Sequence, residues 1–240
     1  MHRSPAVEIT GRYTLHQNII LRIILAVVAA LCLLFIASEA AGAADKSVYV
    51  TLTTDLSSKT VRTDESNLAN IVADAIRAAD KADISFIPAS AFQDVTISKG
   101  TRTSEDILKA LMYPEDNIVI VKLTGLQIHT ALEQSLALSP QKNSAFLQVS
   151  GMTINIDPSA ERGKRISTIK IGKSPVINDK NYLVAMPSPL ANGALAYFKV
   201  WSKKDIDHET EKSLEQAVID YLTTQKSIAG KSEDRLVFKK

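Results

Sequence analysis

One segment, residues 64–88, limits the fold more than any other part of this 240-residue sequence. Its apolar residues recur three and four positions apart and so share one face of a helix that follows the candidate caps Asp64 and Ser66: Leu68, Ile71, Val72, Ala75, Ile76 and Ala79. The run Ile84–Ile87 is short, apolar and bounded by Pro88, which predicts a buried strand. In folds that combine helices and sheets, function tends to lie at the turn after such a strand.

The rest of the sequence predicts an α+β fold, a single domain whose mixed β-sheet is packed by helices. Apolar or alternating residues predict strands at 46–52, 118–123, 151–156, 166–171 and 182–186. Capping boxes at Thr103–Asp106 and Thr124–Gln127 predict a short helix as far as residue 111 and a longer second helix. A last amphipathic helix is expected at 214–222, followed by a polar tail. Helices and strands alternate early and strands cluster later, as in α+β domains.

Residues 1–44 are expected to be a signal peptide, and residues 45–240 the folded domain. Basic residues precede the unbroken apolar run Ile23–Ala37, and Ala41–Ala44 supplies small residues for a signal peptidase. The apolar run is shorter than the ~20 residues that a spanning helix usually needs, which favours cleavage over the alternative, an uncleaved N-terminal membrane anchor. The expected location is therefore the periplasm or the outside of the cell.

Composition narrows the classes of partner. The chain has 28 Lys and Arg and 26 Asp and Glu, of which the leader holds three and two, so the predicted domain is nearly neutral. Nucleic-acid binding usually leaves a basic footprint, so no nucleic-acid partner is expected. The single cysteine, Cys32, lies in the leader, and the domain must be stabilised by its core without disulfides.

Four segments resemble, in order, the C-terminal domain of the 5'-nucleotidase family. They are Glu65–Asn70 with the helix and strand that follow, Tyr113–Gly125, Phe146–Gly151, and Tyr182–Ala185 running on to Tyr197. The resemblance covers residues 48–225, nearly the whole predicted domain. It implies a stand-alone domain of this type, without the metallophosphoesterase domain that accompanies it in the family.

The resemblance implies that catalysis lies outside this chain. In the family, hydrolysis is attributed to a separate N-terminal domain that holds two metal ions. The predicted domain has only His129 and His208 as histidines, neither with the spacing of metal ligands, and both are interpreted as surface or boundary residues. We therefore expect no catalytic residue, no metal site and no cofactor here.

The resemblance also implies a nucleotide pocket that this sequence has altered. Relatives hold the base between two aromatic rings and present an asparagine, a glycine-rich turn and arginines. The corresponding turn here, Pro88–Gln93, has lost the asparagine, the glycines and the arginine, and with them a tight backbone approach and a donor fork. Glu115 and Pro189 stand where the two rings are expected. Neither can stack on a base, so the pocket is expected to be degenerate.

Six residues remain candidates for ligand binding by resemblance: Arg62, Asn67, Tyr113, Asn117, Gly193 and Tyr197. Simpler structural interpretations stand beside them. Arg62 would then be a solvated loop arginine, and Tyr113 a packing residue. Asn67 and Asn117 would be helix-cap or turn residues.

Two main functions follow from these observations. The preferred one is an exported binding or interaction module that is not catalytic by itself. The alternative is the substrate-recognition component of a split 5'-nucleotidase in nucleotide catabolism, working with a separate metallophosphoesterase chain. Another periplasmic protein is also a possible partner. A weaker hypothesis is a membrane-tethered scaffold, because contact with a membrane is expected only if the leader is uncleaved.

Overall fold

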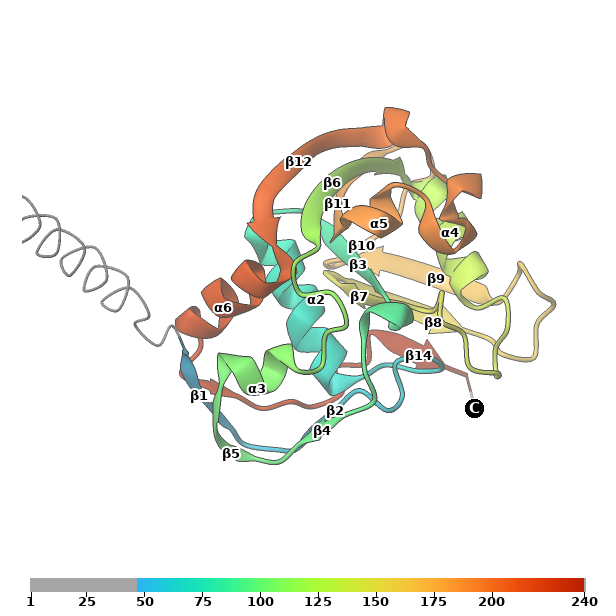
Figure 1. Ribbon diagram of the computed structural model, residues 1–240. Helices are drawn as coiled ribbons and strands as arrows, with labels where there is room; N and C mark the ends of the chain where they lie inside the picture. The colour runs from blue at the N-terminus through green and yellow to red at the C-terminus, as the bar shows by residue number, and fades with distance from the viewer. Residues whose placement is uncertain (1–46, 240) are drawn as a thin grey trace, which may run out of the picture. The chain divides into compact units, whose positions relative to one another are not determined.

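The computed structural model describes residues 47–239 (Figure 1), so the predicted leader lies outside the described residues. Its largest sheet has the strand order β12-β6-β11-β3-β7. These strands are β3 (Ile84–Pro88), β6 (Asn117–Thr124), β7 (Leu147–Ser150), β11 (Asn181–Pro187) and β12 (Ile206–Ser213). β3 and β11 run parallel, and the other neighbours run antiparallel. The sheet is therefore mixed, and the predicted α+β single domain is confirmed.

The apolar run of β6 explains its central position. The residues from Ile118 to Val121 and Leu123 are buried, and the strand is paired on both sides, with β12 and with β11. A strand with both edges paired and both faces covered is expected to read as a continuous apolar run. The prediction of an interior strand at 118–123 is confirmed.

Helix α2 (Asn67–Ala79) covers one face of this sheet and packs against β3 and β7 and against α6 (Leu214–Thr224) (Figure 1). Ser66 caps it, because its hydroxyl accepts a hydrogen bond from the Ala69 N–H at 3.2 Å. The predicted apolar face is buried, apart from the partly buried Ala79. The segment 64–88 thus folds as its periodicity predicts.

Both predicted capping boxes are confirmed. Thr103 and Asp106 cap α3 (Ser104–Leu108), which ends three residues earlier than expected, and Thr124 and Gln127 cap α4 (Gly125–Ser135). A Cβ atom at Gly125 would overlap the backbone of Ile177, so only glycine fits this close approach. The short helices are α5 (Ser188–Ala191), η1 (Ala89–Ala91), η2 (Ala194–Lys199) and η3 (Lys203–Asp205).

Three smaller sheets complete the described domain. One has the order β10-β9-β8-β14, with β8 (Met152–Ile156), β9 (Ile166–Ile171), β10 (Ser174–Pro175) and β14 (Leu236–Phe238). A second has the order β13-β1-β5, with β1 (Tyr49–Leu52), β5 (Gly100–Thr103) and β13 (Ser227–Ile228). The third pairs β2 (Leu56–Ser57) with β4 (Thr96–Ile97). Among residues 47–239, no helix is long and apolar enough to cross a membrane.

The prediction that the chain ends in a polar tail after α6 is wrong. The chain returns to the domain, where β13 pairs in parallel with β1 and β14 pairs in parallel with β8. Figure 1 shows this last segment running from α6 past the end of β1 and on to β14. These strands are only two and three residues long, too short for an alternating pattern to show in the sequence. Their position depends on partners far back in the chain.

Candidate functional site

All five strands of the large sheet begin or end at one edge, which we call the turn edge, and β12 ends there with Ser213 opposite Asn117. β3 and β11 end there at Pro88 and Pro187, and β6 and β7 begin there, with Ile118 opposite Pro187 and Leu147 opposite Pro88. The segments that leave this edge include the altered family turn Pro88–Gln93. The turn edge is thus the place where the resemblance predicts a nucleotide.

Backbone hydrogen bonds to neighbouring segments hold the 88–93 turn in place. The N–H groups of Ala89 and Ser90 donate to the carbonyls of Phe146 (2.8 Å) and Ser144 (3.0 Å). On the other side, the Gln93 N–H donates to Ala110, and the Met112 N–H donates to Ala91, both at 2.9 Å. The side chains of Ala89, Ala91 and Phe92 are buried. This turn is therefore held by contacts within the domain on both of its sides.

Arg62, one of the six candidates for ligand binding, is paired with an acidic side chain in this structure. Its guanidinium donates to the Asp94 carboxylate at 2.6 Å and to the Phe92 carbonyl at 3.4 Å. The side chains of Arg62 and Asp94 are 26% and 51% exposed, so the pair lies at the surface. The Arg62 guanidinium therefore contacts the end of the 88–93 segment, at the Phe92 carbonyl and at Asp94.

Tyr197 is a core residue in this structure. Its side chain is fully buried, its hydroxyl donates to the Ala145 carbonyl at 2.7 Å, and its ring stacks on Trp201 with centroids 4.9 Å apart. Burial raises the pKa of the Tyr197 hydroxyl well above its usual range. Gly193 adopts a left-handed backbone (φ 87°) before η2, where a Cβ atom would crowd Phe198.

The six predicted residues do not form one site. Arg62, Tyr113, Asn117, Gly193 and Tyr197 belong to segments that meet near the turn edge, but of these only Tyr113 and Asn117 are exposed. Asn67 lies at the start of α2, where its amide accepts from Ser57 N–H (2.8 Å) and donates to the carbonyls of Asp55 (2.9 Å) and Gly230 (2.6 Å). Ligand binding by these residues stays a prediction.

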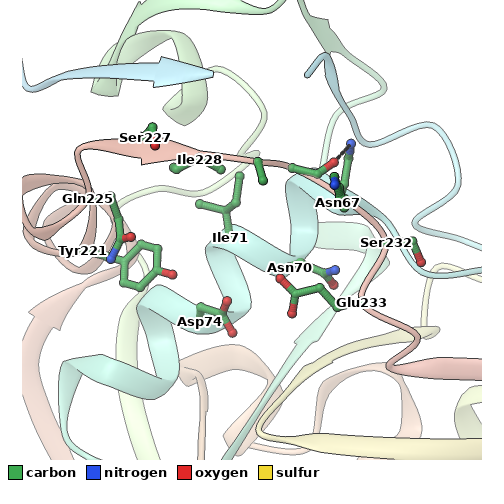
Figure 2. Close-up of a pocket in the computed structure, with 13 residues that line it drawn as sticks. Asn67, Asn70, Ile71, Asp74, Tyr221, Gln225, Ser227, Ile228, Ser232 and Glu233 are labelled. Carbon is green, nitrogen blue, oxygen red and sulfur yellow. Dashed lines mark hydrogen bonds between the residues drawn. The ribbon is translucent and has the colours of Figure 1, made fainter. Parts of the chain in front are cut away.

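A cavity of ≈ 420 Å³, which the sequence analysis missed, lies between α2, α6 and the returning segment 225–233 (Figure 2). We call it the C-terminal cavity. Its walls are Asn67, Asn70, Ile71 and Asp74 from α2, Tyr221 from α6, and Gln225 and residues 227–233 from the segment that follows. Figure 2 shows Asp74, Asn70 and Glu233 together at one end, and Ile71 and Ile228 along the wall.

A buried arginine, Arg235, holds the returning segment against α2. Its guanidinium donates to Asp74 Oδ2 (2.8 Å), to Glu233 Oε2 (2.7 and 3.1 Å) and to the Val149 carbonyl (2.8 Å). Burial lowers the pKa of the guanidinium, but the two carboxylates outweigh burial and raise it. Arg235 therefore stays charged, and we call these contacts the Arg235 network.

Glu65 also holds the returning segment, because its carboxylate accepts hydrogen bonds from two backbone N–H groups of that segment. One carboxylate oxygen accepts from the Glu233 N–H (2.8 Å) and from the Asn70 amide (2.5 Å), and the other accepts from the Arg235 N–H (2.9 Å). Burial raises the pKa of Glu65, yet these hydrogen bonds outweigh it and hold the pKa below its ordinary value. The carboxylate is therefore ionised in the folded protein.

The two histidines lie apart from both regions. His129, half-buried on α4, lines a small pocket of ≈ 250 Å³ beside β9. His208, on the exposed edge strand β12, lies between the carboxylates of Asp80 and Asp207. Within residues 47–239, no three His, Cys, Asp or Glu side chains are grouped as metal ligands.

A comparison with known protein families shows to which family this chain belongs. The model of the family described as "5'-nucleotidase, C-terminal domain" matches residues 41–201. The chain belongs to this family. The match ends before β12, so α6 and the returning segment, which supply nine of the 13 residues that line the C-terminal cavity, lie beyond it.

Known relatives are much longer than the matched region. The chain is 32% identical to an apyrase of Aedes albopictus over 106 residues, which are 40% of this chain and 19% of that protein. It is 30% identical over 162 residues to the trifunctional nucleotide phosphoesterase protein YfkN of Bacillus subtilis, covering 64% of this chain and 11% of that protein. The chain thus spans less than a fifth of the length of either relative.

Solved structures show the same fold. The 5'-nucleotidase precursor of Thermus thermophilus aligns with a TM-score of 0.71 and 24% identity, covering 88% of this chain and 43% of that one. The NAD nucleotidase of Haemophilus influenzae aligns with a TM-score of 0.69 and 16% identity, covering 79% and 37%. At these identities the likeness establishes the architecture, and the activity must be argued from this chain's own residues.

Proposed function

We propose that this member of the family is an exported binding or interaction module that does not hydrolyse nucleotides by itself. One observation carries the proposal: the turn edge is occupied by the protein's own groups. The 88–93 turn is bonded on both sides, Arg62 is paired with Asp94, and Tyr197 is committed to the core. A nucleotide would find neither the free arginine fork nor the open glycine turn that recognition requires.

Metal-dependent hydrolysis of a phosphate ester needs a converging set of side chains that would hold metal ions, and those ions would bind the phosphate and supply a hydroxide from bound water. The described residues offer no such group, which supports placing any hydrolysis outside this domain. The relatives named for nucleotide hydrolysis are proteins several times longer than the matched region.

The test combines an assay of activity with an assay of binding. Purified protein, supplemented with Mn²⁺, Co²⁺ or Zn²⁺, should release no inorganic phosphate from AMP and no glucose 1-phosphate from UDP-glucose, and calorimetry should show no heat of binding for AMP. Phosphate release that follows the protein through purification would overturn the proposal. Saturable AMP binding that Arg62→Ala abolishes would contradict it equally, because it would mean that the Arg62–Asp94 pair opens for a ligand.

The second candidate function is substrate recognition in a split nucleotidase, and the exposure of Tyr113 favours it. Its side chain is 51% exposed, and the preceding residue, Met112, is bonded to Ala91 in the 88–93 turn. An exposed ring beside the family turn can replace one face of the lost aromatic sandwich, because stacking requires only a π-face.

A tyrosine substitution separates these two candidates. If Tyr113 stacks on a base, Tyr113→Ala should abolish the quenching of protein fluorescence by adenosine, while Tyr49→Ala should leave it unchanged. Tyr49 is a matched control, because it is 65% exposed and lies on β1. An equal response of both variants would remove the split-enzyme candidate.

A further inference from the structure

We propose that the C-terminal cavity binds a small aliphatic amine through its ammonium group. This inference is independent of the proposed function, because the cavity shares no residue with the 88–93 turn and nine of its 13 lining residues lie beyond the family match. Its basis is a buried hydrogen-bond acceptor without a donor, set among carboxylates beside an apolar wall.

The acceptor is the side-chain oxygen of Asn70. Asn70 lines the cavity and is 3% exposed, and within residues 47–239 no group donates to its Oδ1. Its Nδ2 donates to Glu65 at 2.5 Å, which fixes the orientation of the amide and leaves Oδ1 as the free end. A buried acceptor without a partner is costly, so it indicates a donor that this structure lacks.

The carboxylates beside Asn70 favour a ligand whose hydrogen-bond donor carries a positive charge. Asp74 and Glu233 line the cavity, whereas Arg235, which pairs with both, does not. The hydrogen bonds from Arg235 use only Oε2 of Glu233, so Oε1 is available to a ligand. Lys231, the one cationic side chain in the wall, is exposed. An anion would meet two carboxylates here, and an ammonium would gain from them.

The Tyr221 hydroxyl adds a further polar contact. Tyr221 is half-buried, and among the described residues its hydroxyl has no hydrogen-bond partner, so it can accept from an ammonium. Burial raises its pKa, and the charges of Asp74 and Glu233 raise it further. The hydroxyl therefore stays neutral and adds no charge of its own.

The remaining wall suits an aliphatic stem. Ile71 and Ile228 are 5% and 8% exposed and line the cavity with Ala229 and the ring of Tyr221. A polar end with few acceptors and an apolar wall is the usual pattern of a small-molecule site. An alkyl chain that carries one terminal ammonium matches both parts.

Binding requires a small movement of the wall. The Asn70 Oδ1 is out of contact with solvent, and residues 231–234 at this end of the cavity are exposed. An ammonium reaches the oxygen when the exposed residues Lys231 and Ser232 move outward, while Glu233 and the rest of the Arg235 network stay in place. The backbone signals of residues 231–234 should therefore change most on binding.

The experiment is a titration of the purified full chain with n-butylammonium, followed by NMR and by thermal unfolding. The expected result is saturable binding that raises the melting temperature by mass action and shifts signals of residues 231–234. n-Butanol and butyrate, which share the stem but lack the cation, should bind at least tenfold more weakly. Equal binding of butanol or butyrate, or the absence of saturable binding, would overturn the proposal.

Two variants and a control locate the site. Glu233→Gln should weaken n-butylammonium binding about tenfold, the equivalent of about 1.4 kcal/mol, and Asn70→Leu should weaken it at least as much. Glu211→Gln, which removes an exposed carboxylate on β12, should leave binding unchanged. Circular dichroism confirms folding, and Glu233→Gln keeps the test decisive if Asn70→Leu unfolds. Equal binding by wild type and Glu233→Gln would refute the site.

Discussion

The turn edge and the C-terminal cavity use arginine in opposite ways. At the turn edge, where the family resemblance predicts a ligand, Arg62 forms a surface pair with Asp94, and the N–H groups of Ala89, Ser90, Phe92 and Gln93 in the 88–93 turn donate to backbone carbonyls. At the C-terminal cavity, whose wall combines Asn67 and Asn70 of the family segment with residues beyond the family match, the buried Arg235 pairs with two carboxylates, and the Asn70 side-chain oxygen has no donor among the described residues. Our two proposals therefore separate the retention of a family position from the capacity to bind a ligand.

The largest expected effect comes from removing Arg235. Arg235→Ala leaves the partly buried Asp74 carboxylate without its cation, and breaking a buried pair from one side costs about 3–5 kcal/mol. Urea unfolding should show this loss in the free energy of unfolding. Lys231→Ala, in the same segment but exposed, is the control and should stay within about 0.5 kcal/mol of wild type. A loss below about 1 kcal/mol for Arg235→Ala would mean that the Arg235 network does not hold the segment.

Tyr197→Phe should have the next largest effect. It keeps the stack on Trp201 but removes the donor to the Ala145 carbonyl, close to residues 144 and 146 that hold the 88–93 turn. An unpaired buried acceptor costs about 1–3 kcal/mol, which thermal or urea unfolding can measure. Tyr113→Phe, on an exposed ring, should change almost nothing. Equal stabilities of the two variants would indicate that Tyr197 is held by packing alone.

Arg62→Ala should cost less than about 1 kcal/mol, because exposed ion pairs contribute little. A double-mutant cycle with Asp94→Ala should give a coupling energy of about 0.2–1 kcal/mol. This sharpens the contrast between the two arginines, since the same substitution at Arg235 should cost several times more. A coupling energy above about 2 kcal/mol would show that the turn edge depends on this pair.

The smallest effect concerns pH and lies outside both regions. Hydrogen bonds to Asp207 and then Asp80 raise the pKa of His208 above its ordinary value of 6.5. Its stabilising contribution is therefore complete below about pH 6.5 and is lost as the pH rises through the higher folded-state pKa. His208 is nearly half exposed, so the effect should stay within about 0.5 kcal/mol. Unfolding of wild type and His208→Gln at about pH 6 and pH 9 should show a difference at the lower pH only.

Local patterns predicted most of the fold. The helix at 67–79, the buried strand at 84–88 and both capping boxes depend on residues within a few positions of one another. β13 and β14 could not be predicted in this way, because each is held by a strand far away in sequence, such as Ile154 opposite Leu236. The buried cation at Arg235 also makes this segment resemble a polar tail.

The candidate sites were harder to predict than the fold. The sequence showed that family groups were missing at 88–93, but not that Arg62 would pair with Asp94, 32 residues away, or that Tyr197 would reach Ala145, 52 residues away. Asn70 is not among the apolar residues that predict the buried face of its helix. It is buried only because the segment around Glu233 and Arg235 folds over it.

The late position of Arg235 has a consequence for the order in which the domain is completed. Asp74 precedes its cation by 161 residues, so a chain synthesised from its N-terminus presents the polar face of α2 uncompensated until nearly all of the described domain exists. β14, which follows Arg235, can pair with β8 only after that. A chain that stops before residue 235 therefore lacks both the cation that pairs with Asp74 and the strand that pairs with β8.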